Sequence, residues 1–277
     1  MSHDGLRKYL PWTASFQKAK LAQDHLRQVA QYILDSNREK KKQSTESSSR
    51  MEFIIDRIIS HDYPEPADTH RLSDILTFVL AGHETSSNTL CFFLYEISRN
   101  KTQQKMLQDE LDEHITLENC PNGHPTYSQI SKLEYLNNCL RESMRLWPTV
   151  PAIARTTVEE IEYDGIVIPE KSLVQCNFYS IFHASWIVRP HEFIPERWSP
   201  GHELYDEKLK EMFMPFAEGH RNCIGQNMAM IQLKILIANI IRYYEFELVD
   251  GNKDLSEEFE VALLMKIPKL VMRVKKR

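Results

Sequence analysis

The chain has 277 residues, of which 42% are hydrophobic, enough to form the core of one large domain or two ordinary ones. Its 39 acidic and 34 basic residues give a formal net charge of −5 and are spread evenly along the chain. This balance excludes the basic surface of a nucleic-acid-binding protein. The five cysteines are odd in number and widely spaced, which excludes a disulfide framework or a zinc site and indicates a reducing compartment.

The N-terminal part predicts helices separated by a polar linker. Apolar residues at helical spacing predict an amphipathic helix over 14–43, and the charged, then serine-rich segment 39–49 predicts a mobile surface linker. A short helix is predicted over 51–62, ended by Pro64. The chain has no apolar run of about 18 residues and no apolar signal-peptide core, so we expect no membrane anchor in this chain.

A long helix is predicted over 67–99, with the polar sequence AGHETSS in its middle. Gly82 costs about 1 kcal/mol relative to alanine in a helix interior, and Glu84 and Thr85 are polar in an otherwise apolar stretch. We expect the helix to open locally here. The turn is either a solvent-facing polar surface or an acid and an alcohol placed for proton transfer.

A second amphipathic helix is predicted over 133–147, where Glu142 and Arg145 lie three residues apart. On an exposed helix such a pair contributes only about 0.2–0.5 kcal/mol. Arg155 follows this helix and precedes β-branched runs around an Asp-Gly pair at Asp164, which predict a hairpin and further strands.

The segment 215–244 combines a cysteine loop with a long apolar helix. Cys223 lies between Gly219 and Gly225, and the residues behind it are apolar on nearly every helical face, which predicts a helix buried on all sides. At the start of such a helix, the backbone N–H groups and the helix dipole favour a thiolate, the form that binds metals. Arg221 adds a cation for the sulfur or for an anionic cofactor group. The alternative is a buried cysteine that acts as a small hydrophobe.

Two apolar runs near the C-terminus, VALLMKI and KLVMRV, predict a closing hairpin. Together with the helices, the short strands predict one domain over 1–277 that is mainly α with small β-sheets, an α+β fold.

These motifs resemble those of the cytochrome P450 family. FAEGHRNCIG matches the family signature FxxGxRxCxG at every specified position. AGHETS resembles the element of the oxygen-binding helix, and LRESMRLWP and PERW resemble the ExxR helix and its downstream partner. The order of the motifs also agrees, and on this alignment the chain corresponds to the C-terminal half of a member of microsomal type. The five matching positions of the signature are Phe216, Gly219, Arg221, Cys223 and Gly225.

The resemblance implies haem b, with the Cys223 thiolate as axial ligand of the iron. Phe216, Gly219 and Gly225 would shape the loop around the cofactor. The resemblance also implies that Arg221 contacts a haem propionate. It suggests the same for Arg155, for which a solvated arginine at a strand end is an equal alternative.

On the long helix, the resemblance implies that Ala81 and Gly82 form a groove for O2. Glu84 and Thr85 would orient water and relay protons to the bound oxygen. The resemblance further implies a buried structural network that holds the cysteine loop, formed by Glu142, Arg145 and Arg197.

For the activity, the resemblance implies a monooxygenase that inserts one oxygen atom from O2 into an apolar small-molecule substrate. Electrons would come from NADPH through a cytochrome P450 reductase-type flavoprotein. Family members of this kind reside on the cytosolic face of the endoplasmic reticulum membrane, whereas a chain without an anchor would be cytoplasmic. Two alternatives remain: a truncated, non-catalytic fragment or interaction protein that cannot hold haem, and haem-thiolate isomerase or dehydratase chemistry. The intact Glu84–Thr85 pair disfavours the latter.

Overall fold

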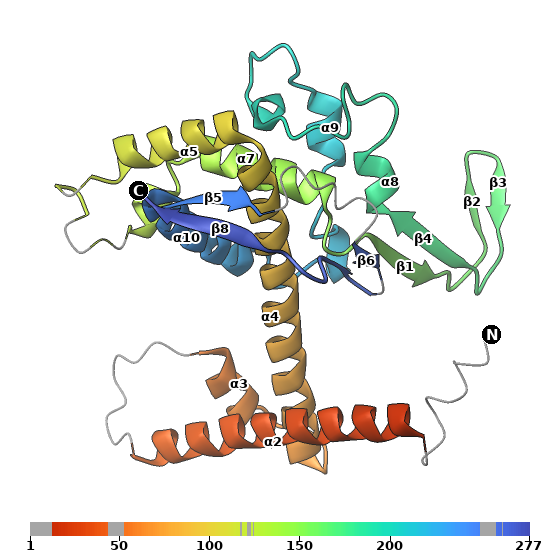
Figure 1. Cartoon of the computed structure of the whole chain (residues 1–277). Helices are drawn as coiled ribbons and strands as arrows, with labels where there is room; N and C mark the ends of the chain where they lie inside the picture. Colours follow the sequence, from red (N-terminus) through yellow and green to blue (C-terminus); the bar gives the residue numbers. More distant parts are fainter. Residues whose placement is uncertain are drawn as a thin grey trace. The chain divides into compact units, whose positions relative to one another are not determined.

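The computed structural model describes residues 13–43, 53–116, 118–120, 123, 125–249, 259–261 and 263–277 (Figure 1). The chain divides into two compact units, one ending at His83 and the other beginning at Glu84. Within the described ranges, none of the helices combines the length and the apolar character needed to cross a membrane.

The first unit is built on helix α2 (Ala14–Gln43), which packs against α3 (Ile54–Ser60). Ala30 and Leu34 lie one turn apart on α2 and form a small core with apolar residues of α3 and α4 (Ala67–Arg99). Residues 39–43, which both the predicted helix and the predicted linker include, are helical. Lysine and glutamate are good helix formers, so the helix extends through them. The rest of the predicted linker, 44–49, lies outside the described residues.

Helix α4 covers the residues of the predicted long helix and continues as α-helix through Gly82. The expectation that the helix opens at this point is therefore wrong. Ala81, Gly82 and Glu84 are exposed, so no packing forces the backbone apart there. The hydroxyl of Ser87 donates to the Glu84 carbonyl at 3.1 Å, so this polar side chain bonds within the helix.

In the second unit, α10 (Gln226–Tyr243) packs against α5 (Lys101–His114), α6 (Tyr127–Ile130) and α7 (Glu134–Leu146) (Figure 1). Leucine and isoleucine side chains from these helices share one core with the second half of α4. The prediction that the apolar helix behind the cysteine is buried on all sides is wrong. Its buried residues lie on one side from the third turn onward, and Met228 in its first turn is 67% exposed: Leu233, Ile237, Ala238 and Ile241 are the buried ones.

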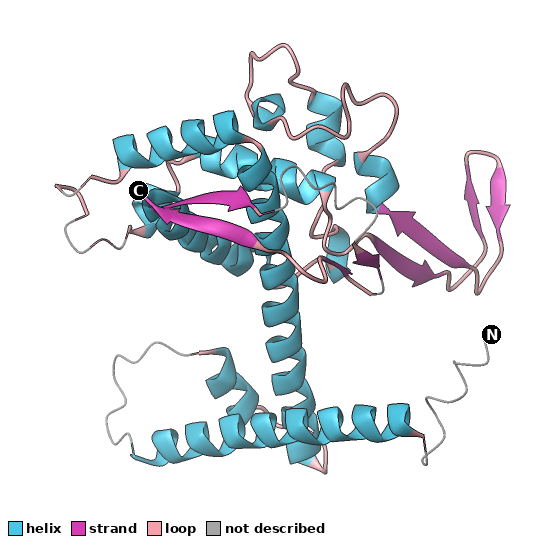
Figure 2. Ribbon diagram, viewed as in Figure 1, coloured by secondary structure: helices cyan, strands magenta, loops and turns pink. Residues whose placement is uncertain are grey.

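The strands of the described residues form four two-stranded antiparallel sheets (Figure 2). The predicted hairpin is present as β2 (Ile161–Tyr163) and β3 (Ile166–Ile168), joined through Asp164 and Gly165 with φ values of 51° and 74°. Positive φ at both positions is what a tight two-residue hairpin turn requires. The other pair in this region is β1 (Ala152–Thr156) with β4 (Leu173–Asn177).

The predicted closing hairpin at the C-terminus is wrong in its pairing. The first apolar run forms its own short hairpin, β6 (Glu260–Val261) with β7 (Met265–Lys266). The second run forms β8 (Met272–Lys276), which pairs with β5 (Tyr244–Leu248) directly after α10. Local apolarity predicts a strand but not its partner. The architecture confirms the predicted class, mainly α with small β-sheets.

Candidate functional site

The cysteine loop leads from α9 (Glu207–Met212) through the short helix η2 (Gly219–Arg221) into α10. Ala217 and Gly219 have φ values of 58° and 78°, which turn the chain sharply. The Cys223 amide donates to the Phe216 carbonyl at 2.9 Å and closes the loop. The Phe216 side chain packs against the core of the second unit, so the loop is anchored at its base. Cys223 is thereby held just before the first turn of α10.

The surface around Cys223 is open, apolar and cationic. Cys223 itself is exposed, and Ile224 beside it is 88% exposed. A Cβ built on Gly225 would lie 3.9 Å from the sulfur, so the glycine keeps that side of the sulfur uncovered. Arg221 is exposed in the same loop. An uncovered thiol among large apolar side chains suits a bulky apolar ligand that carries anionic groups.

The donor set fits haem rather than a bare metal ion. In the part of the chain that the structure describes, no three His, Cys, Asp or Glu side chains gather as a metal site. A single protein sulfur suits an iron whose in-plane ligands come from its own macrocycle, because the protein then supplies only an axial ligand. Cys223 meets that requirement.

The polar turn of α4 is accessible on part of its surface. Glu84 is exposed and Thr85 is half-buried. A Cβ built on Gly82 meets no atom within 4 Å, and Ala81 beside it is exposed. The Thr85 carbonyl accepts a hydrogen bond from the Thr89 hydroxyl at 2.9 Å. The sequence therefore places an acid and an alcohol side by side on an accessible helical turn.

The Glu142 carboxylate is fully buried and binds two arginines. Its Oε1 accepts from Arg145 Nη2 at 2.9 Å and from Arg197 Nε at 2.8 Å, and its Oε2 accepts from Arg145 Nε at 2.9 Å. Two further donors were not foreseen from the sequence: the Trp198 indole N–H at 2.9 Å and the Ile194 amide at 3.1 Å. The tryptophan in PERW was the available signal, because a buried indole N–H needs an acceptor.

The remaining guanidinium N–H groups bind backbone carbonyls of one segment. Arg145 donates to the carbonyls of Phe182 and Pro190 at 2.8 and 2.6 Å. Arg197, on the short helix η1 (Pro195–Trp198), donates to two more carbonyls at 3.1 and 3.2 Å, those of Val188 and Arg189. The network thus binds α7 to the segment 182–198, whose backbone would otherwise lack regular partners.

An aromatic contact continues from this network toward the cysteine loop. The Trp198 ring packs against Phe213, with ring centroids 4.7 Å apart. Phe213 also packs against Phe182, at 5.3 Å, and lies three residues before Phe216. The buried charges and the base of the loop are therefore connected through packed side chains.

Among the described residues, the Arg155 side chain makes only a local hydrogen bond. It is exposed on β1, where it pairs with Val174 across the sheet, and its Nη1 donates to the Ala154 carbonyl at 2.8 Å. Its contact with a haem propionate stays a prediction.

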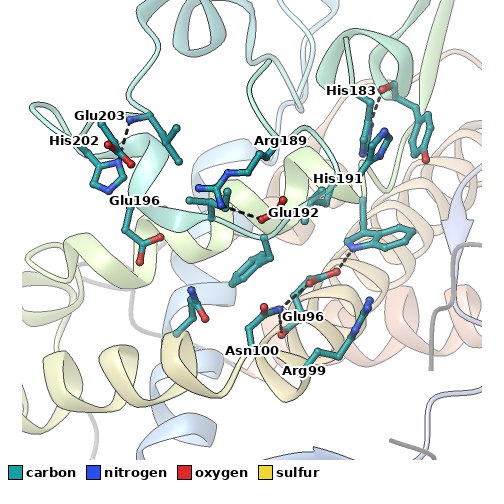
Figure 3. A pocket seen from close by; sticks show the side chains of 17 residues that line it. Glu96, Arg99, Asn100, His183, Arg189, His191, Glu192, Glu196, His202 and Glu203 are labelled. Atoms are coloured by element: carbon teal, nitrogen blue, oxygen red, sulfur yellow. Dashed lines mark hydrogen bonds and ion pairs between the residues drawn. The ribbon is translucent and has the colours of Figure 1, made fainter. Parts of the chain in front are cut away.

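A separate cavity of about 750 Å³ is lined mainly by polar residues and contains none of the predicted site residues (Figure 3). Buried Glu96 lies at its wall, where its carboxylate accepts from the Trp147 indole at 2.7 Å and from the Asn100 amide at 3.2 Å. Burial raises the pKa of Glu96 above its ordinary value. The sequence motifs did not predict this cavity, because none of the site residues that they predicted lines it.

The fold and the loop define a mainly α protein that presents one accessible thiol at the start of a long helix. A family model described as Cytochrome P450 matches residues 6–274, and the chain belongs to this family. Cytochrome P450 3A11 of Mus musculus is 32% identical over 208 residues, which cover 72% of this chain and 40% of that protein. Cytochrome P450 3A5 of Homo sapiens is 31% identical over 220 residues, 76% of this chain and 42% of that protein. The chain thus spans about two fifths of these relatives.

Replacing Glu142 with alanine should lower the free energy of unfolding by about 3–5 kcal/mol, because two buried guanidinium groups lose their counter-charge. The matched control is Glu192→Ala, which removes an exposed carboxylate 3.2 Å from Arg189 and should cost less than about 1 kcal/mol. Urea unfolding followed by circular dichroism measures both. Equal losses in the two variants would refute a special role for Glu142.

Stability should also depend on pH through His183. Burial, with a smaller contribution from nearby Arg145 and His191, lowers the pKa of His183 to about 4 from its ordinary 6.5. Between these pH values the unfolded chain binds a proton that the folded chain does not. The free energy of unfolding should therefore decrease as the pH falls from 7 to 4.

His183→Asn should flatten this decrease, whereas His25→Asn, at an exposed position of α2, should leave it unchanged. The measurement is urea unfolding at several pH values between 4 and 7. The same pH slope in His183→Asn as in the parent chain would exclude His183 as its source.

Proposed function

We propose that this chain forms the haem-thiolate site of a monooxygenase that inserts one oxygen atom from O2 into an apolar organic substrate. The observation that carries the proposal is the signature loop, which holds an exposed Cys223 just before α10 among uncovered apolar side chains. Membership of the cytochrome P450 family supports it.

When bound, haem would supply the iron at which oxygen is activated. The Cys223 thiolate would bind that iron, held in place by the hydrogen bond from the Cys223 amide to the Phe216 carbonyl. The turn at Gly219 and the missing side chain at Gly225 would let the flat macrocycle approach the sulfur. Arg221 would pair with a propionate, and Arg155 would be a second cation for the same purpose.

On α4, the Thr85 hydroxyl would hold a proton at its oxygen beside the cofactor site. Exposed Glu84 would take protons from solvent and pass them to Thr85 or to water beside it. Ala81 and Gly82 would leave space for O2 next to the helix, since a Cβ at Gly82 meets no neighbouring atom. Electrons would come from NADPH through a reductase-type flavoprotein at the endoplasmic reticulum membrane.

The network of Glu142, Arg145 and Arg197 would act structurally. It would hold the segment that leads to the cysteine loop, and it would not contact the reacting atoms. Loss of the network would destabilise the fold, and it would weaken haem binding only as a consequence of that destabilisation.

One observation favours a second candidate. The first turns of α10 and the loop before it expose apolar side chains, among them Ile224 and Met228. A chain whose apolar surface is not covered by cofactor would be a non-catalytic fragment or an interaction protein.

Cys223→Ser should abolish thiolate-ligated haem binding, because a serine hydroxyl stays protonated and is a poor ligand for haem iron. The control is Cys176→Ser on strand β4, outside the loop, which should bind haem like the parent chain. A spectrophotometric haemin titration of the three proteins measures affinity and stoichiometry. Unchanged thiolate-type binding in Cys223→Ser would overturn the assignment, and no binding by the parent chain would support the fragment.

A further inference from the structure

Two buried threonines join α4 to the segment that follows α7. Thr89 lies one turn after Thr85 in α4, and Thr149 lies between α7 and β1. Each is only 8% exposed. Their hydroxyl oxygens are 2.9 Å apart, and the Thr89 hydroxyl also lies 2.9 Å from the Thr85 carbonyl oxygen. Sixty residues separate the two threonines in the sequence.

The number of hydrogens determines the direction of these bonds. A threonine hydroxyl has one hydrogen to donate, and a carbonyl oxygen can only accept. The Thr89 hydroxyl therefore gives its hydrogen to Thr85, and Thr149 must donate the bond to Thr89. The result is a directed chain from the Thr149 hydroxyl through the Thr89 hydroxyl to the Thr85 carbonyl.

Thr149 is itself fixed by its neighbours. Its carbonyl accepts from the amide of Met265, in β7, at 2.8 Å. Two residues earlier, Trp147 stacks on Phe92 of α4 with ring centroids 5.2 Å apart and donates to Glu96. The segment 147–149 thus contacts successive turns of α4. Of these contacts, the Thr149–Thr89 bond lies nearest to Glu84 and Thr85.

We infer that Thr89 and Thr149 are positioning residues for the turn of α4 that carries Glu84 and Thr85. This inference rests on the proposed role of that turn in oxygen activation. The hydroxyl chain ends on a peptide carbonyl, which has no proton to pass on, so the pair orients the turn and does not deliver protons.

A double-mutant cycle tests the hydroxyl chain without cofactor. Thr89→Val removes both bonds and leaves the buried Thr149 hydroxyl without its acceptor, whereas Thr149→Val leaves the bond from Thr89 to Thr85 intact. We expect the urea midpoint to fall more for Thr89→Val than for Thr149→Val. The double variant should fall by less than the sum of the two. Ser87→Ala, which removes an exposed hydroxyl, should not shift the midpoint. Additive effects would refute the hydrogen bond between the two hydroxyls. A larger loss for Thr149→Val would refute the direction of that bond.

Amide hydrogen exchange then tests the positioning. In Thr89→Val, exchange should become faster in the peptide that contains Glu84 and Thr85, with no change in the β2–β3 hairpin. Thr89→Ser keeps the hydroxyl and should restore the slow exchange. Faster exchange throughout the second unit, or no rescue by serine, would reduce the pair to a general stabilising contact and overturn the inference.

The haem-loaded chain gives the functional readout. With electrons from a chemical reductant, Thr89→Val should release a larger share of the consumed oxygen as hydrogen peroxide, and Thr89→Ser should return that share to the parent value. An unchanged share of hydrogen peroxide in Thr89→Val would contradict the proposal that Thr89 positions the turn carrying Thr85. If the parent chain binds no haem, the proposed function fails, while the unfolding cycle still decides whether the hydroxyl chain exists.

Discussion

The buried carboxylate of Glu142 is the centre of the hydrogen bonds that hold the irregular segment 182–198 of the second unit. It accepts hydrogen bonds from two guanidinium groups, an indole and an amide, and those guanidinium groups bind carbonyls along the segment 182–198. Removing these charges from water is costly, and the cost is offset only while every donor has its acceptor. Trp198 also packs against Phe213, which lies three residues before Phe216 at the base of the cysteine loop.

The loop itself is rigid at its base and open at its tip. Phe216 is packed and bonded to the Cys223 amide, whereas Cys223 and Ile224 are exposed. A thiol held at the base of a loop, with apolar side chains uncovered around it, suits contact with a ligand or with another surface. Under the proposed function, haem would be this ligand, since its iron would bind the sulfur and its macrocycle would cover the apolar side chains. The cation at Arg221 would then face its anionic edge.

Several features could be predicted from the sequence because their signals are local. The Asp164–Gly165 turn predicted its hairpin, and helical spacing predicted α4 and α7. The pairing of β8 with β5 and the bond between Thr89 and Thr149 could not be predicted, because they join residues far apart in the chain. Composition also could not show which faces of α10 would be covered, since an apolar helix is buried only where the chain supplies a partner. The roles of Cys223, Glu84, Thr85 and Arg155 remain predictions from the family motifs.

The account depends most on the claim that this chain holds iron through Cys223. The most direct measurement is the absorption spectrum of the chain, expressed with a haem supply, then reduced and bound to carbon monoxide. The account predicts the red-shifted Soret band typical of thiolate ligation. No haem band, or only a band typical of haem without a thiolate ligand, would contradict it and would leave the chain as a family fragment that does not form the haem site.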